Sequence, residues 1–223
     1  MKPLQEKAYE RLMTMIINDE LDHGVVYSEA KVAEDMGMSR TPVRAALQRL
    51  TQDKYIDILP SRGFKIHEVT ERESIEIFEM RTAIEGYSAL MLARNCQSSK
   101  AMETINKLKH NIEKQREIVL GSGDIEEFIE WDLKFHSLIL EYSGNKIFLN
   151  NFNSSINIIR TLARISLRHE GRMPVGFKEH EDLYKAIVNG DINNIFELTE
   201  RSMENPKSIT LSDILAKDII VHK

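Results

Sequence analysis

From residue 70 to the end of the chain, apolar side chains recur every three or four residues, and no strand-like alternation of any length interrupts them. This spacing places the apolar residues of each segment on one face of an α-helix. The second part of the chain is therefore restricted to an all-α bundle. The spacing predicts helices over about 70–95, 99–120, 124–142, 146–168, 177–189 and 191–204, and a last amphipathic segment at about 211–220.

The first part of the chain has a different pattern. One helix is predicted over 4–18, a second begins at Ser28 and ends at Gly37, and a third opens at Ser39 and runs to Gln52. Two helices joined by a few residues that include glycine are typical of a helix-turn-helix. The runs "YIDIL" and "FKIHEV", separated by "PSRG", predict a β-hairpin after them. The fold class is mainly α, with a winged helix-turn-helix over 1–68 and an all-α domain over 69–223.

Positive charge is concentrated on one short stretch of an otherwise acidic chain. The whole chain has a net charge of −5, and residues 1–38 have a net charge of −4. Residues 39–65, however, hold six Lys or Arg against two Asp, which gives a net charge of +4. A focused positive field attracts a polyanion even when the protein as a whole is acidic.

The third helix begins with arginines, although positive charge is unfavourable at a helix N-terminus. Arg40 and Arg44 are four residues apart and share a face, with Thr41 beside them. A helix that enters the major groove reads base edges from its N-terminal residues, where arginine binds guanine or phosphate. A solvated basic face on a structural helix is the alternative. The candidate DNA-binding residues are Arg40, Thr41, Arg44, Arg49 (for a backbone phosphate), and Arg62 and Gly63 at the hairpin tip.

Composition excludes several other classes. The longest uncharged run, 147–159, has 13 residues and is rich in Asn and Ser. A membrane-spanning helix needs about 20 mostly apolar residues, so no membrane segment is expected. No apolar segment of a secretory signal follows Lys2. Cys96 is the only cysteine, which excludes internal disulfides and favours a cytoplasmic protein.

Polar residues lie on the apolar rows of two predicted helices. Asp132 and His136 follow Phe128 at intervals of four residues, and His180 stands three residues after Phe177. An inward-pointing polar group without a partner costs about 2–7 kcal/mol, so something must satisfy these side chains. Three explanations are open: an Asp–His hydrogen bond, a 2-His-1-carboxylate metal site with open positions, or an organic acid held by arginines with the histidines as donors.

Three arginines are candidates for binding a carboxylate effector. Arg81 stands between Ile77 and Ile84 on a mostly apolar helix, while Arg160 and Arg164 are four residues apart and share a face. A guanidinium group binds a carboxylate with two parallel hydrogen bonds.

The segment "VAEDMGMSRTPVRAALQRL", residues 32–50, resembles the GntR family of bacterial repressors nearly throughout. The resemblance implies a DNA-binding winged helix that works as a dimer. Arg40, Arg44 and Gly63 match the DNA-contacting positions of that family, with Thr41 and Arg49 as further candidates. Some members use an arginine early in the second helix, where this chain has Ala30.

The helical part is similar to the FCD type of effector domain in "EMRTAIEGYSALMLA", "WDLKFHSLIL" and "EHEDLYKAIVNGD". Many such domains bind a divalent metal of the zinc or nickel type through one Asp and three His. Asp132, His136 and His180 fall on the first three positions, and Ser202, a poor ligand, falls on the fourth. The resemblance implies small carboxylates or sugar acids as effectors, and Ser202 is a further candidate for binding the effector.

These observations predict a ligand-responsive transcriptional regulator, most simply a repressor, and not an enzyme. It is expected to bind a palindromic double-stranded DNA operator as a homodimer and a small organic acid in the helical domain. Two alternatives are a metal sensor without an organic effector and a metal-dependent enzyme that uses the 2-His-1-carboxylate set.

Overall fold

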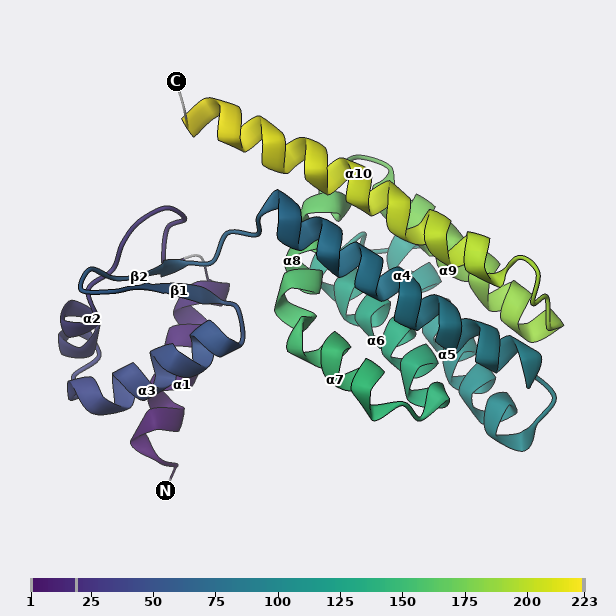
Figure 1. Cartoon of the computed structure of the whole chain (residues 1–223), viewed down its shortest axis with the longest axis horizontal. Helices are drawn as coiled ribbons and strands as arrows, with labels where there is room; N and C mark the ends of the chain where they lie inside the picture. The colour runs from purple at the N-terminus through teal and green to yellow at the C-terminus, as the bar shows by residue number, and fades with distance from the viewer. Residues whose placement is uncertain (1, 19, 222–223) are drawn as a thin grey trace. The chain divides into compact units, whose positions relative to one another are not determined.

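A computed structural model describes the backbone of residues 2–18 and 20–221 and the side chains of residues 2–18 and 20–216 (Figure 1). The chain divides into two compact units, residues 1–68 and 69–223, and each is described by itself. Within the described residues, no helix combines the length and the apolarity needed to cross a bilayer.

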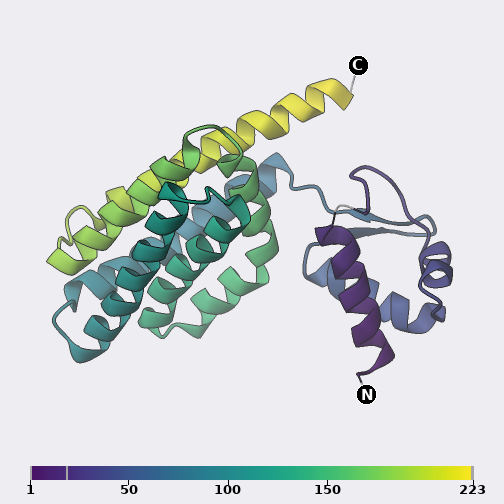
Figure 2. The ribbon, with the colours of Figure 1, turned by 180° about the vertical axis from the view of Figure 1, so that it is seen from behind.

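The first unit is a winged helix-turn-helix, as predicted. It contains helices α1 (Leu4–Ile17), α2 (Glu29–Asp35) and α3 (Arg40–Gln52), followed by strands β1 (Ile56–Leu59) and β2 (Gly63–Ile66). The strands pair antiparallel, with Ile56 opposite Ile66. Helix α1 packs along α3, which is visible in Figure 2. The core consists of the apolar faces of all these elements and includes Leu12, Val43, Leu47, Leu50, Ile56 and Phe64.

The hairpin of β1 and β2 is the wing, and backbone hydrogen bonds join it to Tyr27 in the segment before α2. The amide of Tyr27 donates to the carbonyl of Phe64 at 2.7 Å, and the amide of Phe64 donates back at 2.9 Å. Gly63 has a φ of 126°, and a Cβ there would lie 2.0 Å from the Tyr27 carbonyl oxygen. This close approach of two backbone segments requires glycine. Gly63 therefore has a structural explanation that is independent of DNA.

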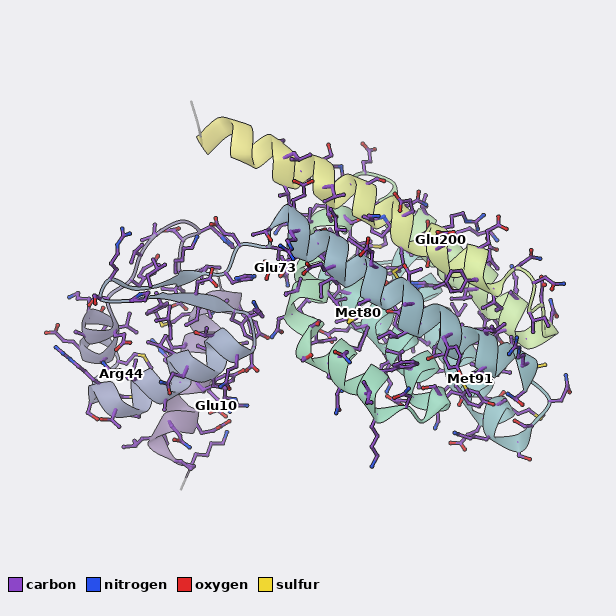
Figure 3. The ribbon with its side chains drawn as sticks, viewed as in Figure 1. Glu10, Arg44, Glu73, Met80, Met91 and Glu200 are labelled. Carbon is purple, nitrogen blue, oxygen red and sulfur yellow. The ribbon has the colours of Figure 1, made fainter. Side chains whose placement is uncertain are left out.

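The second unit is all-α, as predicted. Its helices are α4 (Glu71–Arg94), α5 (Ser99–Leu120), α6 (Ile125–Ser143), α7 (Lys146–Ser154), α8 (Ile156–Leu167), α9 (Arg172–Asn189) and α10 (Ile195–Val221). Helices α4 and α10 lie side by side in both ribbon views (Figures 1 and 2). Thr70 begins α4 with a capping box that includes Glu73, labelled in Figure 3.

The predicted breaks between helices differ from the structure in two places. The helix predicted over 146–168 breaks at Ser155, whose φ and ψ of −102° and 3° end α7 and start α8. The segments predicted over 191–204 and 211–220 form one helix, α10, that continues through Pro206. Proline removes one backbone hydrogen bond from a helix interior. The packing of α10 against α4, α8 and α9 outweighs that loss.

Helix α9 begins five residues earlier than predicted, at Arg172 rather than at 177. Gly171 precedes it in the left-handed conformation, with a φ of 77°. Pro174 lies in the first turn, where the amide that proline lacks would have no intrahelical partner. The glycine and proline of "HEGRMPVG" thus start a helix instead of extending a loop. This early start brings Arg172 into the bundle.

Candidate functional site

A small cavity lies inside the second unit, between α4, α6, α8, α9 and α10. Its volume is about 40 Å³, room for about three water molecules. The residues that line it and that the sequence had singled out are Arg81, Asp132, His136, His180 and Ser202. The structure therefore brings together candidates from four helices that are far apart in the sequence.

Asp132, His136 and His180 converge on one point of this cavity. The Oδ1 atom of Asp132 lies 3.3 Å from Nε2 of His180 and 3.8 Å from Nε2 of His136. The ligand atoms of the three side chains all lie within 4.8 Å of one another. Both imidazole rings are buried, and their planes stand at 80° to each other. One ion at the centre is within reach of all three side chains.

Nδ1 of His136 contacts a buried ion pair on α4, formed by Arg81 and Glu85. This nitrogen lies 2.6 Å from Oε2 of Glu85, and Arg81 Nε donates to the other oxygen of Glu85 at 2.7 Å. Burial by itself raises the pKa of Glu85, but Arg81 and His136 together outweigh it and lower the pKa to about 2. The ionised carboxylate lies against Nδ1 and favours a proton there, so Nε2 is the ring nitrogen that faces Asp132.

His180 is oriented by a chain of amides that ends on the backbone. Asn111 Nδ2 donates to the carbonyl of Trp131 at 2.9 Å, which fixes the orientation of that amide. Gln115 Nε2 donates to Asn111 Oδ1 at 2.7 Å, so Oε1 of Gln115 accepts from His180 Nδ1 at 2.8 Å. Burial lowers the pKa of His180 well below its ordinary value. The ring is therefore neutral, with the lone pair of Nε2 toward Asp132.

His180 and Asp132 thus direct electron pairs at each other with no hydrogen between them, and Nε2 of His136 faces the same oxygen. An Asp132–His180 hydrogen bond would need the proton on Nε2, and Gln115 holds it on Nδ1. Two imidazoles and a carboxylate fit a divalent transition-metal ion, with Gln115 hydrogen-bonded to the His180 ring and Glu85 lying 2.6 Å from Nδ1 of His136. The residues present therefore suit the metal that the family resemblance implies.

Ser202 lies in the cavity wall, at the position where the resemblance places a fourth ligand. Its side chain is buried, and its Oγ donates to the carbonyl of Thr199 at 2.8 Å. The hydroxyl hydrogen is used within α10, so the oxygen offers only weak lone pairs to a cation.

Arg160 and Arg164 are not brought to the cavity, in contrast to the sequence expectation that they bind the effector. Arg160 pairs with Glu130, and Arg164 Nη2 donates to Glu126 Oε2 at 2.7 Å. Both partners lie on α6 and are largely exposed. The arginines do share a face of α8, but that face meets acidic side chains at the start of α6.

Sequence reasoning missed Arg172, which lines the cavity and is buried, as Arg81 is. Its Nη2 donates to Oε2 of Glu179 at 2.7 Å, and Asn205 Nδ2 donates to the other oxygen of that carboxylate at 2.5 Å. It also missed Glu85 and Gln115. The spacing of Glu85, four residues after Arg81 on an apolar helix, was a usable signal, whereas nothing distinguished Gln115.

The first turns of α3 present the candidate DNA-contacting side chains. Arg40, Thr41 and Arg44 are exposed, and Arg40 has no ion-pair partner among the described residues. Nε and Nη2 of Arg44, which is labelled in Figure 3, both contact Oε2 of Glu29, at 3.2 and 3.1 Å. This pair holds Arg44 on the exposed side of α3. Arg62 is exposed in the turn between β1 and β2.

Arg49 is engaged inside the first unit. Its Nη1 lies 3.0 Å from Oε2 of Glu6, and its guanidinium carbon lies 3.9 Å above the ring of Tyr9. The Tyr9 hydroxyl donates to Asp53 at 2.8 Å. Arg49 therefore joins the end of α3 to α1, which gives it a structural role that the sequence expectation of a phosphate contact did not include.

Comparisons with known proteins agree with this architecture. Residues 4–66 match the bacterial regulatory proteins of the gntR family, and residues 76–205 match the FCD domain. The transcriptional repressor RspR of Escherichia coli K12 is 24% identical over 193 residues, which cover 85% of this chain and 81% of that protein. The gluconate operon transcriptional repressor of Bacillus licheniformis is 25% identical over 181 residues, covering 81% of this chain and 70% of the repressor.

Solved structures show the same fold. E. coli McbR/YncC is 21% identical with a TM-score of 0.70, over 96% of this chain and 99% of that chain. The metal-free FCD domain of TM0439 is 19% identical with a TM-score of 0.55, over 67% of this chain and 99% of that chain. The relatives are transcriptional regulators rather than enzymes, so the metal-dependent enzyme is set aside. The chain belongs to the GntR family of DNA-binding transcriptional regulators and carries an FCD effector domain.

Proposed function

We propose that the protein is a cytoplasmic repressor that binds a palindromic operator as a homodimer and is released by a small organic acid. The effector acts together with a divalent metal ion held by Asp132, His136 and His180. Repression is supported by the relatives RspR and the gluconate operon repressor. An operator with two-fold symmetry follows from a homodimer that presents two identical reading helices.

The observation that supports the metal is the convergence of three electron-pair donors. Each histidine presents Nε2 toward Asp132, and each is held in that state by a partner on its other nitrogen, Glu85 or Gln115. A bound zinc- or nickel-type ion would offer open coordination positions to the oxygen atoms of an effector. The cavity volume of about 40 Å³ favours a short acid over a six-carbon sugar acid.

On the DNA side, the proposal assigns base reading to Arg40 and Arg44 and a contact in the neighbouring groove to Arg62. The exposure of Arg40, Thr41 and Arg44 at the N-terminal end of α3 supports this assignment. Effector binding is coupled to DNA through the packing of the five helices around the cavity. A ligand shifts such an equilibrium only by its difference in affinity for the two arrangements.

The test uses the full-length protein stripped of metal with a chelator. A preferred site is selected from random duplex DNA, and binding is followed by fluorescence anisotropy at fixed ionic strength. Nickel or zinc is then added, followed by short organic acids. We expect acids to weaken operator binding only after metal loading, and His136→Ala to abolish metal binding. His110→Ala, an exposed histidine on α5, is the matched control.

A sensor that responds to metal alone is the second candidate, because a hydrated ion is itself large enough to occupy most of a cavity of this size. Release of the operator by nickel or zinc without any acid would favour this candidate. A folded His136→Ala dimer that still releases the operator on addition of metal or of metal and acid, as the wild type does, would reject both.

A further inference from the structure

Arg172 keeps part of its guanidinium group buried without a partner. It is the first residue of α9, and only 8% of its surface is exposed. Glu179 accepts from Nη2 at 2.7 Å, yet Nε and Nη1 have no acceptor among the described residues. A buried charged donor without an acceptor is costly, so these two groups point to a ligand.

A second unpartnered donor faces the same cavity from the neighbouring helix. Ser166 on α8 is 1% exposed, lines the cavity, and has no partner for Oγ among the described side chains and backbone groups. Gly176, one turn after Arg172, makes room for the guanidinium: a Cβ there would lie 3.3 Å from Arg172 Nη1. The site is thus shaped around the arginine, with donors on two helices.

The guanidinium group is also fixed in position. Glu179 is held on its other oxygen by Asn205 Nδ2, at 2.5 Å. The pair of Arg172 and Glu179 is therefore anchored to α10 and does not need to reorganise to receive an anion. Arg81, the other arginine of the cavity, has its Nε and Nη2 directed to Glu85.

Charge restricts the kind of ligand. Arg81 and Arg172 contribute two positive charges, and Asp132, Glu85 and Glu179 contribute three negative charges. An imidazole that binds a metal ion is neutral, so a divalent ion there leaves the group with one positive charge in excess. A mono-anion balances it, and room for about three water molecules limits the ligand to a few carbon atoms.

We propose that Arg172 and Ser166 form an anion subsite that binds the carboxylate of a short mono-anionic hydroxy or keto acid, whose second oxygen reaches the ion at Asp132, His136 and His180. This inference rests on the proposed function for the ion. It goes further by assigning the carboxylate to Arg172 and Ser166 rather than to the arginines that the sequence suggested.

The experiment measures thermal stabilisation of the nickel-loaded full-length protein by glycolate, L-lactate and pyruvate. Propionate, which lacks the second oxygen, and gluconate, which is too large, are the comparison ligands. The apparent Kd follows from the concentration dependence of Tm. The variants are Ser166→Ala and the double variant Arg172→Met with Glu179→Gln, which avoids an unpaired buried carboxylate. Arg160→Met, on α8 outside the cavity, is the control.

We expect at least one of the three acids to stabilise the wild type and the control. Both cavity variants should bind that acid about 10- to 100-fold more weakly while nickel titrations remain at wild-type affinity. Equal acid affinity in variants and wild type would overturn the subsite and leave the metal site intact, as would stabilisation of nickel-loaded wild type by none of the three acids. Acid binding that depends on Arg172 in a protein that does not bind nickel would instead reject the proposed metal function alone.

Discussion

Oε2 of Glu85 on α4 lies 2.6 Å from Nδ1 of His136 on α6. This carboxylate sets the ring so that Nε2 faces Asp132. We therefore expect Glu85→Gln to lower nickel affinity by about 10- to 100-fold, the usual effect of removing such a partner. Competition with a chromophoric chelator measures the loss, and circular dichroism verifies the fold because Arg81 loses its buried partner. Glu103→Gln, exposed on α5, is the control. Wild-type affinity in folded Glu85→Gln would reduce Glu85 to a structural partner of Arg81.

Gln115 has the corresponding role for His180. Gln115→Met removes the acceptor of the Nδ1 hydrogen and leaves the bond from Asn111 to the Trp131 carbonyl in place. The ring then loses the preference that keeps the Nε2 lone pair toward Asp132. We expect nickel affinity to fall about tenfold or more with a small change in the free energy of unfolding. A variant that binds nickel as the wild type does would refute the orientation argument for His180.

The two ends of α3 should behave differently in DNA binding. Arg40→Ala should cost about 1–3 kcal/mol for a selected operator and much less for random duplex DNA, because a base contact is lost. Arg49→Ala should lower the free energy of unfolding by about 1 kcal/mol, since the ring contact and a half-exposed ion pair are both modest, and should change operator affinity little. Equal losses on operator and random DNA for Arg40→Ala would exclude base reading by Arg40.

The wing glycine provides a stability test that is independent of DNA. Gly63→Ala places a Cβ against the Tyr27 carbonyl at a φ of 126°, and we expect unfolding of the first unit at clearly lower denaturant concentration. Gly24→Ala is the matched control, because its φ of 78° is also left-handed but no atom lies within 4 Å of the added Cβ. It isolates backbone strain, about 1 kcal/mol, from the clash. Equal effects of the two substitutions would mean that the wing shifts to accept a side chain.

Periodicity predicted the helices of both units and the inward direction of Asp132, His136 and His180, because residues four apart on an apolar row must face the core. It also placed Arg160 and Arg164 on one face of α8. It could not show which neighbouring helix that face meets, and the face meets α6 outside the cavity.

The errors in helix boundaries arise where local preference and packing compete. Proline signalled a break at 206, but packing of α10 against three helices keeps it continuous. At Ser155 the backbone angles leave the helical range, although the apolar spacing on both sides of this residue is that of one continuous helix. Arg172 was missed because "HEGRMPVG" was interpreted as a loop, so its glycine and proline were not recognised as a helix start.

The proline within α10 has one further consequence. Because Pro206 has no amide hydrogen, the carbonyl of Ser202 lacks its usual helical donor, and the helix bends most easily at this point. Both residues belong to the wall of the cavity. The position at which α10 bends most easily therefore lies in the wall of the binding site. A ligand in the cavity would contact α10 at this position and could change the angle between its two halves.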